Sequence, residues 1–241
     1  HMFDKGVVLK NITYHPLYTP EFANIEMKKG WEPFEEQKPV IEYIVQDGIK
    51  KVIDAQTGQG KTVMTMFGLA QIKQRVAMVI KPMYIERWLD VIVGDGTVLQ
   101  HTTKKDVIVV RGGKQLRSLI YMAQEGTLNA QFIVISNTTL SLYYKHYKEF
   151  GASEEYGWVH PEDLWKLLGV GVRVIDEAHE HFYVCFITDL NSHVHKSVEL
   201  SATLEPDNPF LKRMYNIMYP KHLRMNTGAY KRYIEVYGLT Y

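Results

Sequence analysis

Residues 55–62, with the sequence AQTGQGKT, have the residue types and spacing of a loop that binds phosphate groups, with alanine in place of the usual first glycine. Gly58 and Gly60 allow the backbone to curl so that successive N–H groups point at one centre. Lys61 supplies a positive charge for the β- and γ-phosphates of a nucleotide, and Thr62 offers a hydroxyl group to Mg²⁺. The alternative is a glycine-containing turn with an exposed lysine. The candidate nucleotide-binding residues of this loop are Gln56, Thr57, Gly58, Gln59, Gly60, Lys61 and Thr62.

Two adjacent carboxylates, Asp176 and Glu177, lie at the end of an apolar run in the sequence VRVIDEAH. The carboxyl ends of parallel strands are where such a sheet binds its ligand. We expect Asp176 to hold Mg²⁺ together with Thr62, and Glu177 to polarise the attacking water. A carboxylate pair alone is weak evidence, because many such pairs face solvent. The phosphate loop strengthens the interpretation, since the same nucleotide needs both motifs.

Short apolar runs that alternate with longer amphipathic segments must position these motifs. Strands of four to six residues separated by helices indicate βαβ units and a mostly parallel sheet covered on both faces, a three-layer α/β/α fold. The predicted strands are 51–55, 76–80, 107–110, 132–136, 172–176 and 197–202, and the predicted helices are 39–47, 62–73, 84–92 and 114–124. Residues 7–14 and 233–241 also read as strands, and residues 143–161 favour no single assignment.

The composition of the 241 residues excludes several classes of protein. Lys and Arg number 28 against 27 Asp and Glu, so the net charge of +1 excludes a polybasic protein. A single cysteine, Cys185, excludes an intramolecular disulfide and a cysteine-based zinc finger. No apolar run approaches the roughly 18 residues of a membrane span. We therefore expect a cytoplasmic protein, in the host cytoplasm if the gene belongs to a phage.

A third short motif, Ser201-Ala-Thr203, completes a family resemblance. AQTGQGKT, DEAH and SAT, in this order, resemble the DEAH-box type of superfamily 2 helicases and translocases. Residues 200–215 look most like phage-encoded members. The resemblance implies that residues 36–241 form the N-terminal RecA-like domain of such a motor, preceded by an extension or small accessory segment over residues 1–35.

The resemblance also implies roles for individual residues in an ATPase that nucleic acid stimulates, with ATP and Mg²⁺ as cofactors. Lys61, Asp176, Glu177 and His179 would form the catalytic group. His179, Ser201 and Thr203 would couple the nucleotide site to the nucleic-acid site. Gln37 resembles the glutamine that reads adenine upstream of the phosphate loop, although a fuller adenine-reading motif is missing.

Two segments resemble the strand-gripping motifs of the family and imply contacts with the nucleic-acid backbone. Lys81 and Pro82 follow the second predicted strand, and residues 136–139 follow the fourth. The candidate nucleic-acid contacts are Lys81, Pro82, Arg87, Arg111, Thr138 and Thr139, with Lys114 and Arg117 in the same basic patch. DNA is favoured over RNA, because Trp88 is placed as in Snf2-like translocases and other features resemble phage proteins.

Two other functions and a metal site compete with this interpretation. A nucleotide-dependent binding or scaffold module without unwinding activity would carry the same motifs. A small-molecule kinase would need neither DEAH nor SAT. The histidines at positions 179, 181, 193 and 195 have a spacing that zinc ligands can have, although surface histidines also occur in such runs.

Motors of this type place ATP between two RecA-like domains, and the second domain supplies an arginine to the transition state. Only residues 204–241 follow Thr203, far fewer than the roughly 100–150 residues of a typical domain. We therefore expect a second RecA-like domain to be absent from this chain. The fragment alone is then expected to bind ATP–Mg²⁺ but to hydrolyse ATP weakly or not at all.

Overall fold

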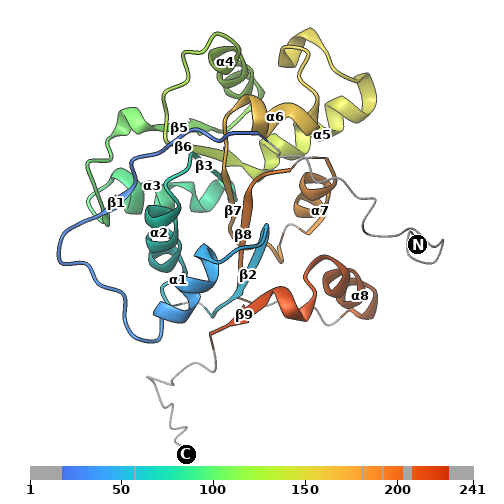
Figure 1. The fold of residues 1–241 in the computed structure, drawn as a ribbon. Coiled ribbons are helices and arrows are strands. Elements are labelled where there is room, and N and C mark those ends of the chain that lie inside the picture. The colour runs from blue at the N-terminus through green and yellow to red at the C-terminus, as the bar shows by residue number, and fades with distance from the viewer. Residues whose placement is uncertain (1–17, 57, 181, 192, 203–207, 228–241) are drawn as a thin grey trace, which may run out of the picture.

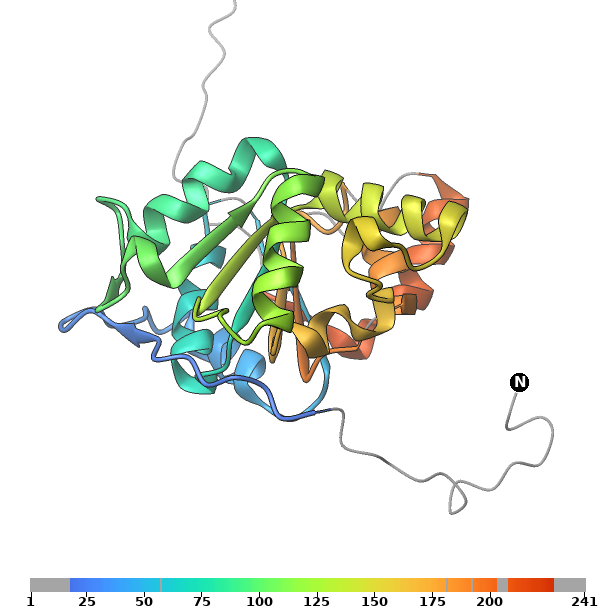
Figure 2. The same ribbon diagram turned by 90° about the horizontal axis from the view of Figure 1, so that it is seen from above.

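The structure of the chain is a computed structural model that describes residues 18–56, 58–180, 182–191, 193–202 and 208–227. A central sheet lies between two layers of helices (Figure 1), and the view from above shows the strands enclosed by these layers (Figure 2). In the described part of the chain, no helix is both long and apolar enough to cross a membrane.

The central sheet has seven strands in the order β5-β6-β3-β7-β8-β2-β9, and all neighbouring strands are parallel. This topology confirms the predicted three-layer α/β/α fold. The strands span Lys50–Asp54 (β2), Val76–Ile80 (β3), Val107–Val110 (β5), Phe132–Ser136 (β6), Val172–Ile175 (β7), Lys196–Ser201 (β8) and Arg224–Asn226 (β9). The predicted strands at 7–14 and 233–241 lie outside the described residues.

Two hydrophobic cores, one on each face of the sheet, hold the helices in place. Along β3, Ala77 and Val79 point into one core, and Val76, Met78 and Ile80 point into the other. The second core contains α1 (Lys38–Val45), α2 (Lys61–Ile72) and α3 (Ile85–Val93). The first core contains α4 (Gly113–Gln124), α5 (Asn137–Phe150), α6 (Pro161–Leu167), α7 (Phe182–Asn191) and α8 (Pro209–Met218).

The described residues before α1 pack on the same domain. Ala23 and Ile25 are buried in the core that contains α1 to α3. Strand β1 (Glu26–Met27) pairs antiparallel with β4 (Leu99–Gln100) in a separate two-stranded sheet. The part of the expected N-terminal extension that the structure describes is therefore attached to the domain by both apolar contacts and backbone hydrogen bonds.

Candidate functional site

The phosphate-loop sequence connects β2 to α2 at the carboxyl end of the sheet. Gly58 and Gly60 have φ angles of 91° and 80°, in the left-handed region where glycine costs little. Gly60 is the N-cap of α2 and provides no side-chain cap, so the first N–H groups of this helix have no capping side chain. A glycine loop therefore leads directly into the first turn of a helix at Gly60, and phosphate binding by this loop stays a prediction. Thr57 lies outside the described residues.

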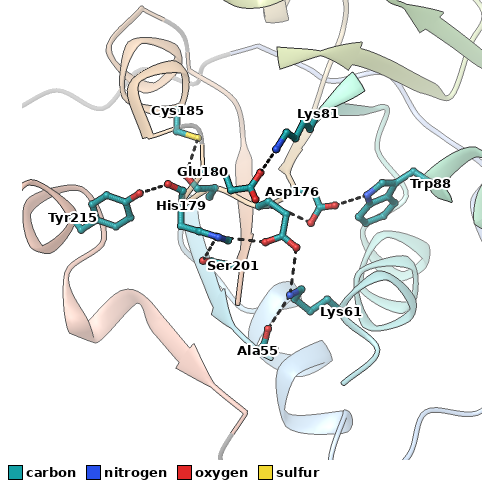
Figure 3. Close-up of polar contacts among 12 residues, drawn as sticks. Ala55, Lys61, Lys81, Trp88, Asp176, His179, Glu180, Cys185, Ser201 and Tyr215 are labelled. Carbon is teal, nitrogen blue, oxygen red and sulfur yellow. Dashed lines mark hydrogen bonds and ion pairs between the residues drawn. The ribbon is translucent and has the colours of Figure 1, made fainter. Parts of the chain in front are cut away.

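Lys61 bends over the loop toward the carboxylates. Its Nζ atom donates a hydrogen bond of 2.9 Å to the carbonyl oxygen of Ala55 and lies 3.9 Å from Oε1 of Glu177 (Figure 3). The side chain of Lys61 is 11% exposed. The structure thus brings together the two motifs that the sequence places far apart.

Gln37 lies against the phosphate loop, although it precedes α1. Its Nε2 atom is 3.5 Å from the carbonyl oxygen of Gln59, and its Oε1 atom accepts a hydrogen bond of 3.1 Å from the backbone N–H of Phe34. A Cβ atom at Gly60 would lie 2.6 Å from Nε2 of Gln37, so this glycine also allows the close approach. The adenine-reading role of Gln37 stays a prediction.

Gln59 connects the loop to the last described strand. Its Oε1 atom accepts a hydrogen bond of 2.8 Å from the backbone N–H of Gln56 and another from the hydroxyl of Thr227, directly after β9. Strand β9, which the sequence analysis missed, therefore helps to fix the loop. Its three residues are too few to show a strand pattern in the sequence.

Asp176 follows β7 and is held by two N–H donors on its two oxygens. The indole Nε1 of Trp88 donates to Oδ2 at 2.7 Å, and the backbone N–H of Glu177 donates to Oδ1 at 3.0 Å (Figure 3). Trp88 is only 2% exposed. The sequence position of Trp88 resembles that of a tryptophan in Snf2-like translocases. In the structure its ring is buried in the core and contacts Asp176, the carboxylate expected to hold Mg²⁺.

Glu177 has a strained backbone and an unsatisfied side chain. Its φ angle of 49° is rare for a residue with a Cβ atom and typically costs about 1–3 kcal/mol. Its Oε2 atom is buried and accepts no hydrogen bond from the described residues, although Nδ1 of His179 lies 3.4 Å away. Such features gather at functional sites, where a ligand or water can satisfy the buried oxygen.

His179 links this carboxylate to the end of β8. Its Nδ1 atom lies 2.9 Å from Oγ of Ser201 and 3.4 Å from Oε2 of Glu177. The carbonyl oxygen of Ser201 in turn accepts a 3.0 Å hydrogen bond from the backbone N–H of Ala55, where the phosphate loop begins. The predicted coupling group is thus continuous from loop to strand end, although Thr203 lies outside the described residues.

The donors around Lys61 fit Mg²⁺ better than zinc. The hydroxyl of Thr62 in the first turn of α2, the carboxylate of Asp176 and the unsatisfied oxygen of Glu177 are all hard oxygen donors. Mg²⁺ is usually held by one or two such groups together with substrate phosphates. Among the described residues, no group of three or more His, Cys, Asp or Glu side chains could hold a metal, and His181, one of the four histidines considered as zinc ligands, lies outside the described residues.

The candidate nucleic-acid contacts lie at or beyond the ends of β3, β5 and β6. Nζ of Lys81 donates a hydrogen bond of 2.6 Å to Oε2 of Glu180, the residue after His179, and this bond raises the pKa of the lysine. Arg111 forms an ion pair with Glu86. Pro82, Arg87 and Thr138 are exposed, as a surface that contacts nucleic acid requires.

Thr139 does not belong to this surface, which corrects the sequence-based expectation. Its side chain is buried, and its Oγ1 atom lies 2.7 Å from Oγ of Ser136. The same Ser136 oxygen accepts a hydrogen bond of 3.1 Å from the backbone N–H of Thr139, so Ser136 caps α5. The hydroxyl of Thr139 therefore stabilises the start of a helix.

No protein-family model and no curated protein matches the chain, but solved structures do. The helicase domain of Hef from Pyrococcus furiosus has a TM-score of 0.55 and 16% identity, over 80% of this chain and 37% of that chain. The UvsW helicase from bacteriophage T4 has a TM-score of 0.50 and 13% identity, over 88% of this chain and 63% of that chain. The SWI2/SNF2 ATPase core from Sulfolobus solfataricus, solved with dsDNA, has a TM-score of 0.47 and 12% identity, over 86% and 38%.

This chain therefore spans less than two thirds of the length of each of these proteins. At identities this low, the structural likeness shows the fold alone, and any function must be argued from the residues of the site. Together with the sheet topology, the likeness to the Hef and UvsW helicases shows that this chain has the RecA-like fold of helicase domains.

Proposed function

We propose that this chain is the ATP-binding motor domain of a nucleic-acid helicase or translocase. The observation that carries the proposal is the convergence of Lys61 and Glu177, 3.9 Å apart, beside the His179–Ser201 contact. A binding module could carry the same residues, but a carboxylate beside the phosphate-binding lysine is also what activation of a water molecule requires. The proposal therefore includes ATP hydrolysis.

In this mechanism the backbone N–H groups of residues 58–62 hold the β- and γ-phosphates at the start of α2. Lys61 exchanges its hydrogen bond with Ala55 for one with a phosphate oxygen. Thr62 and Asp176 would hold Mg²⁺, which supplies charge neutralisation on the phosphates when bound. Glu177 orients the attacking water and accepts its proton through the oxygen that has no hydrogen-bond partner among the described residues.

His179 and Ser201 transmit the state of this site to the surface beside Lys81. The imidazole contacts both the carboxylate of Glu177 and the hydroxyl of Ser201, so a change at the phosphates alters the balance between two partners. Lys81, Pro82, Arg87, Arg111 and Thr138 form the surface proposed to contact the nucleic-acid backbone. DNA is the proposed partner, on the resemblance of residues 200–215 to phage-encoded proteins, and the cytoplasm is the proposed compartment.

We also propose that an arginine from a second RecA-like domain completes the transition state. The arginines at the described end of the chain are occupied elsewhere or exposed: Arg224 donates to the carbonyl oxygen of Tyr219 and to Asn216, and Arg213 is exposed on α8. Loss of such an arginine typically lowers the rate by about 10³–10⁵-fold. The 241 residues alone are therefore expected to turn over slowly.

The experiment that tests this function measures ATP hydrolysis and strand displacement with single-stranded, duplex and branched DNA and with RNA. Stimulation of hydrolysis by DNA above that by RNA supports the proposal. Binding of ATP with no hydrolysis under any of these conditions would instead identify a nucleotide-dependent binding module. Phosphate transfer to a small molecule would identify a kinase.

A further inference from the structure

A groove of about 720 Å³ lies between α5 and α7, and its lining includes none of the residues proposed to bind the nucleotide. Its walls carry tyrosine rings, two lysines and one glutamate, Glu149, and aromatic rings together with a net positive charge are the combination that binds single-stranded nucleic acid. The residues that matter are Ser141, Tyr144, Lys145, Tyr147 and Lys148 on α5, and Tyr183 on α7.

One face of α5 leads from the proposed nucleic-acid surface into this groove. Thr138, Ser141, Lys145 and Lys148 follow one another at intervals of three, four and three residues, so they lie along one side of the helix. At about 1.5 Å per residue, this stripe extends about 15 Å from its first to its last member. A strand that contacts Thr138 can therefore continue along α5.

The charges in the groove are available to a ligand. Neither Lys145 nor Lys148 forms an ion pair in the part of the chain that the structure describes, whereas Lys81 pairs with Glu180 and Arg111 with Glu86. Phosphate groups complement such a pair of cations.

The aromatic rings offer stacking surfaces in fixed positions. Tyr183 is 66% exposed at the groove. The hydroxyl of Tyr147 lies 2.7 Å from Nδ1 of His160, which holds that ring against the groove wall. A base stacked on a tyrosine is typically worth about 1–3 kcal/mol and requires no particular base sequence.

We propose that this groove binds a single strand of nucleic acid as it leaves the surface beside Thr138, with its phosphates on Lys145 and Lys148 and a base on Tyr183. The proposal rests on the function proposed above and adds a second contact area to it. With a spacing of about 3.4 Å per stacked nucleotide, the stripe of about 15 Å accommodates about four nucleotides.

The test measures binding of fluorescein-labelled oligo(dT) by anisotropy at several salt concentrations, for the wild-type chain and for Lys145→Gln/Lys148→Gln. Loss of two phosphate contacts should reduce the salt slope by about 1.4, at about 0.7 per contact for single strands. Lengthening the oligonucleotide by about four nucleotides at either the 5′ or the 3′ end, whichever lies toward the groove, should increase the affinity of the wild type but not of the variant.

Matched controls separate this groove from general effects of charge or folding. Lys104→Gln/Lys105→Gln removes two exposed lysines just before the amino end of β5, whereas α5 begins at the carboxyl end of the neighbouring strand β6, and should leave the slope unchanged. Tyr183→Phe should retain binding, while Tyr183→Ala should weaken it. Thermal unfolding of each variant checks that the fold persists.

If the wild type binds oligo(dT), and Lys145→Gln/Lys148→Gln shows the same salt slope and the same dependence on oligonucleotide length, the groove proposal is wrong. The proposed function would be unaffected by that result. No binding of any nucleic acid by the wild type would contradict both. Self-association of the chain that Tyr183→Ala abolishes would identify the groove as a protein interface and also overturn the proposal.

Discussion

Lys81 at the end of β3 and Glu180 beside the DEAH sequence share a hydrogen bond of 2.6 Å, so a residue proposed to grip nucleic acid is held by the residue after His179 (Figure 3). A phosphate that contacts Lys81 must compete with this carboxylate. Under the proposed function, binding of nucleic acid would therefore displace Lys81 from Glu180, next to the proposed catalytic residues.

Glu180→Gln should strengthen nucleic-acid binding by a few-fold, because the amide competes less well than the carboxylate for the ammonium group of Lys81. Anisotropy titrations at low salt measure the change. Glu125→Gln, at the exposed end of α4, is the matched control and should have no effect. Weaker binding by Glu180→Gln would contradict the competition.

Glu177→Gln should leave ATP binding intact and lower turnover by about 10²-fold or more, because an amide cannot accept the proton of the attacking water. Single-turnover hydrolysis and fluorescent-nucleotide binding separate the two effects. Glu154→Gln on the surface serves as the control. Turnover equal to that of the wild type would remove Glu177 from the mechanism.

Trp88→Phe should raise the Mg²⁺ concentration required for half-maximal hydrolysis, by roughly tenfold, since it removes the N–H group that orients Asp176. The Mg²⁺-dependent part of the thermal shift caused by ADP should shrink as well, which is a readout independent of turnover. Trp165→Phe removes a buried indole from the opposite core and should not change the Mg²⁺ dependence. An equal effect of both substitutions would reduce Trp88 to a packing role.

Ser136→Ala should lower the free energy of unfolding by about 1 kcal/mol, because it removes the cap of α5. Denaturant unfolding measures this change, and Ser118→Ala within α4 is the control.

Thr139→Val should leave nucleic-acid affinity unchanged. A large loss of affinity in Thr139→Val would restore this residue to the binding surface.

Much of the fold could be predicted because buried parallel strands are continuous apolar runs. The predicted strands at 76–80, 107–110 and 132–136 match β3, β5 and β6 to the residue. Helix α5 was missed because its buried positions include Tyr143 and Tyr144 among polar residues, which obscures the helical pattern. Strands β1 and β4 have two residues each, too few to show an alternation.

The location of the candidate site could also be predicted, because both motifs end strands of one parallel sheet. The side-chain contacts within the candidate site could not be predicted from the sequence. The hydrogen bond between Trp88 and Asp176 depends on how α3 packs, and the pair formed by Lys81 and Glu180 joins two loops far apart in the sequence. Thr139 was assigned to the surface because a sequence does not distinguish a hydroxyl that faces solvent from one that caps a helix.

The most direct test of the central claim is single-turnover hydrolysis of ATP by excess protein, with and without single-stranded DNA, for the wild-type chain and Lys61→Ala. Single-turnover conditions detect even the slow reaction expected of one RecA-like domain. Lys29→Ala, an exposed lysine away from the loop, is the control. The account predicts hydrolysis that DNA accelerates and that only Lys61→Ala abolishes. Equal rates for the wild type and Lys61→Ala, with or without DNA, would contradict it.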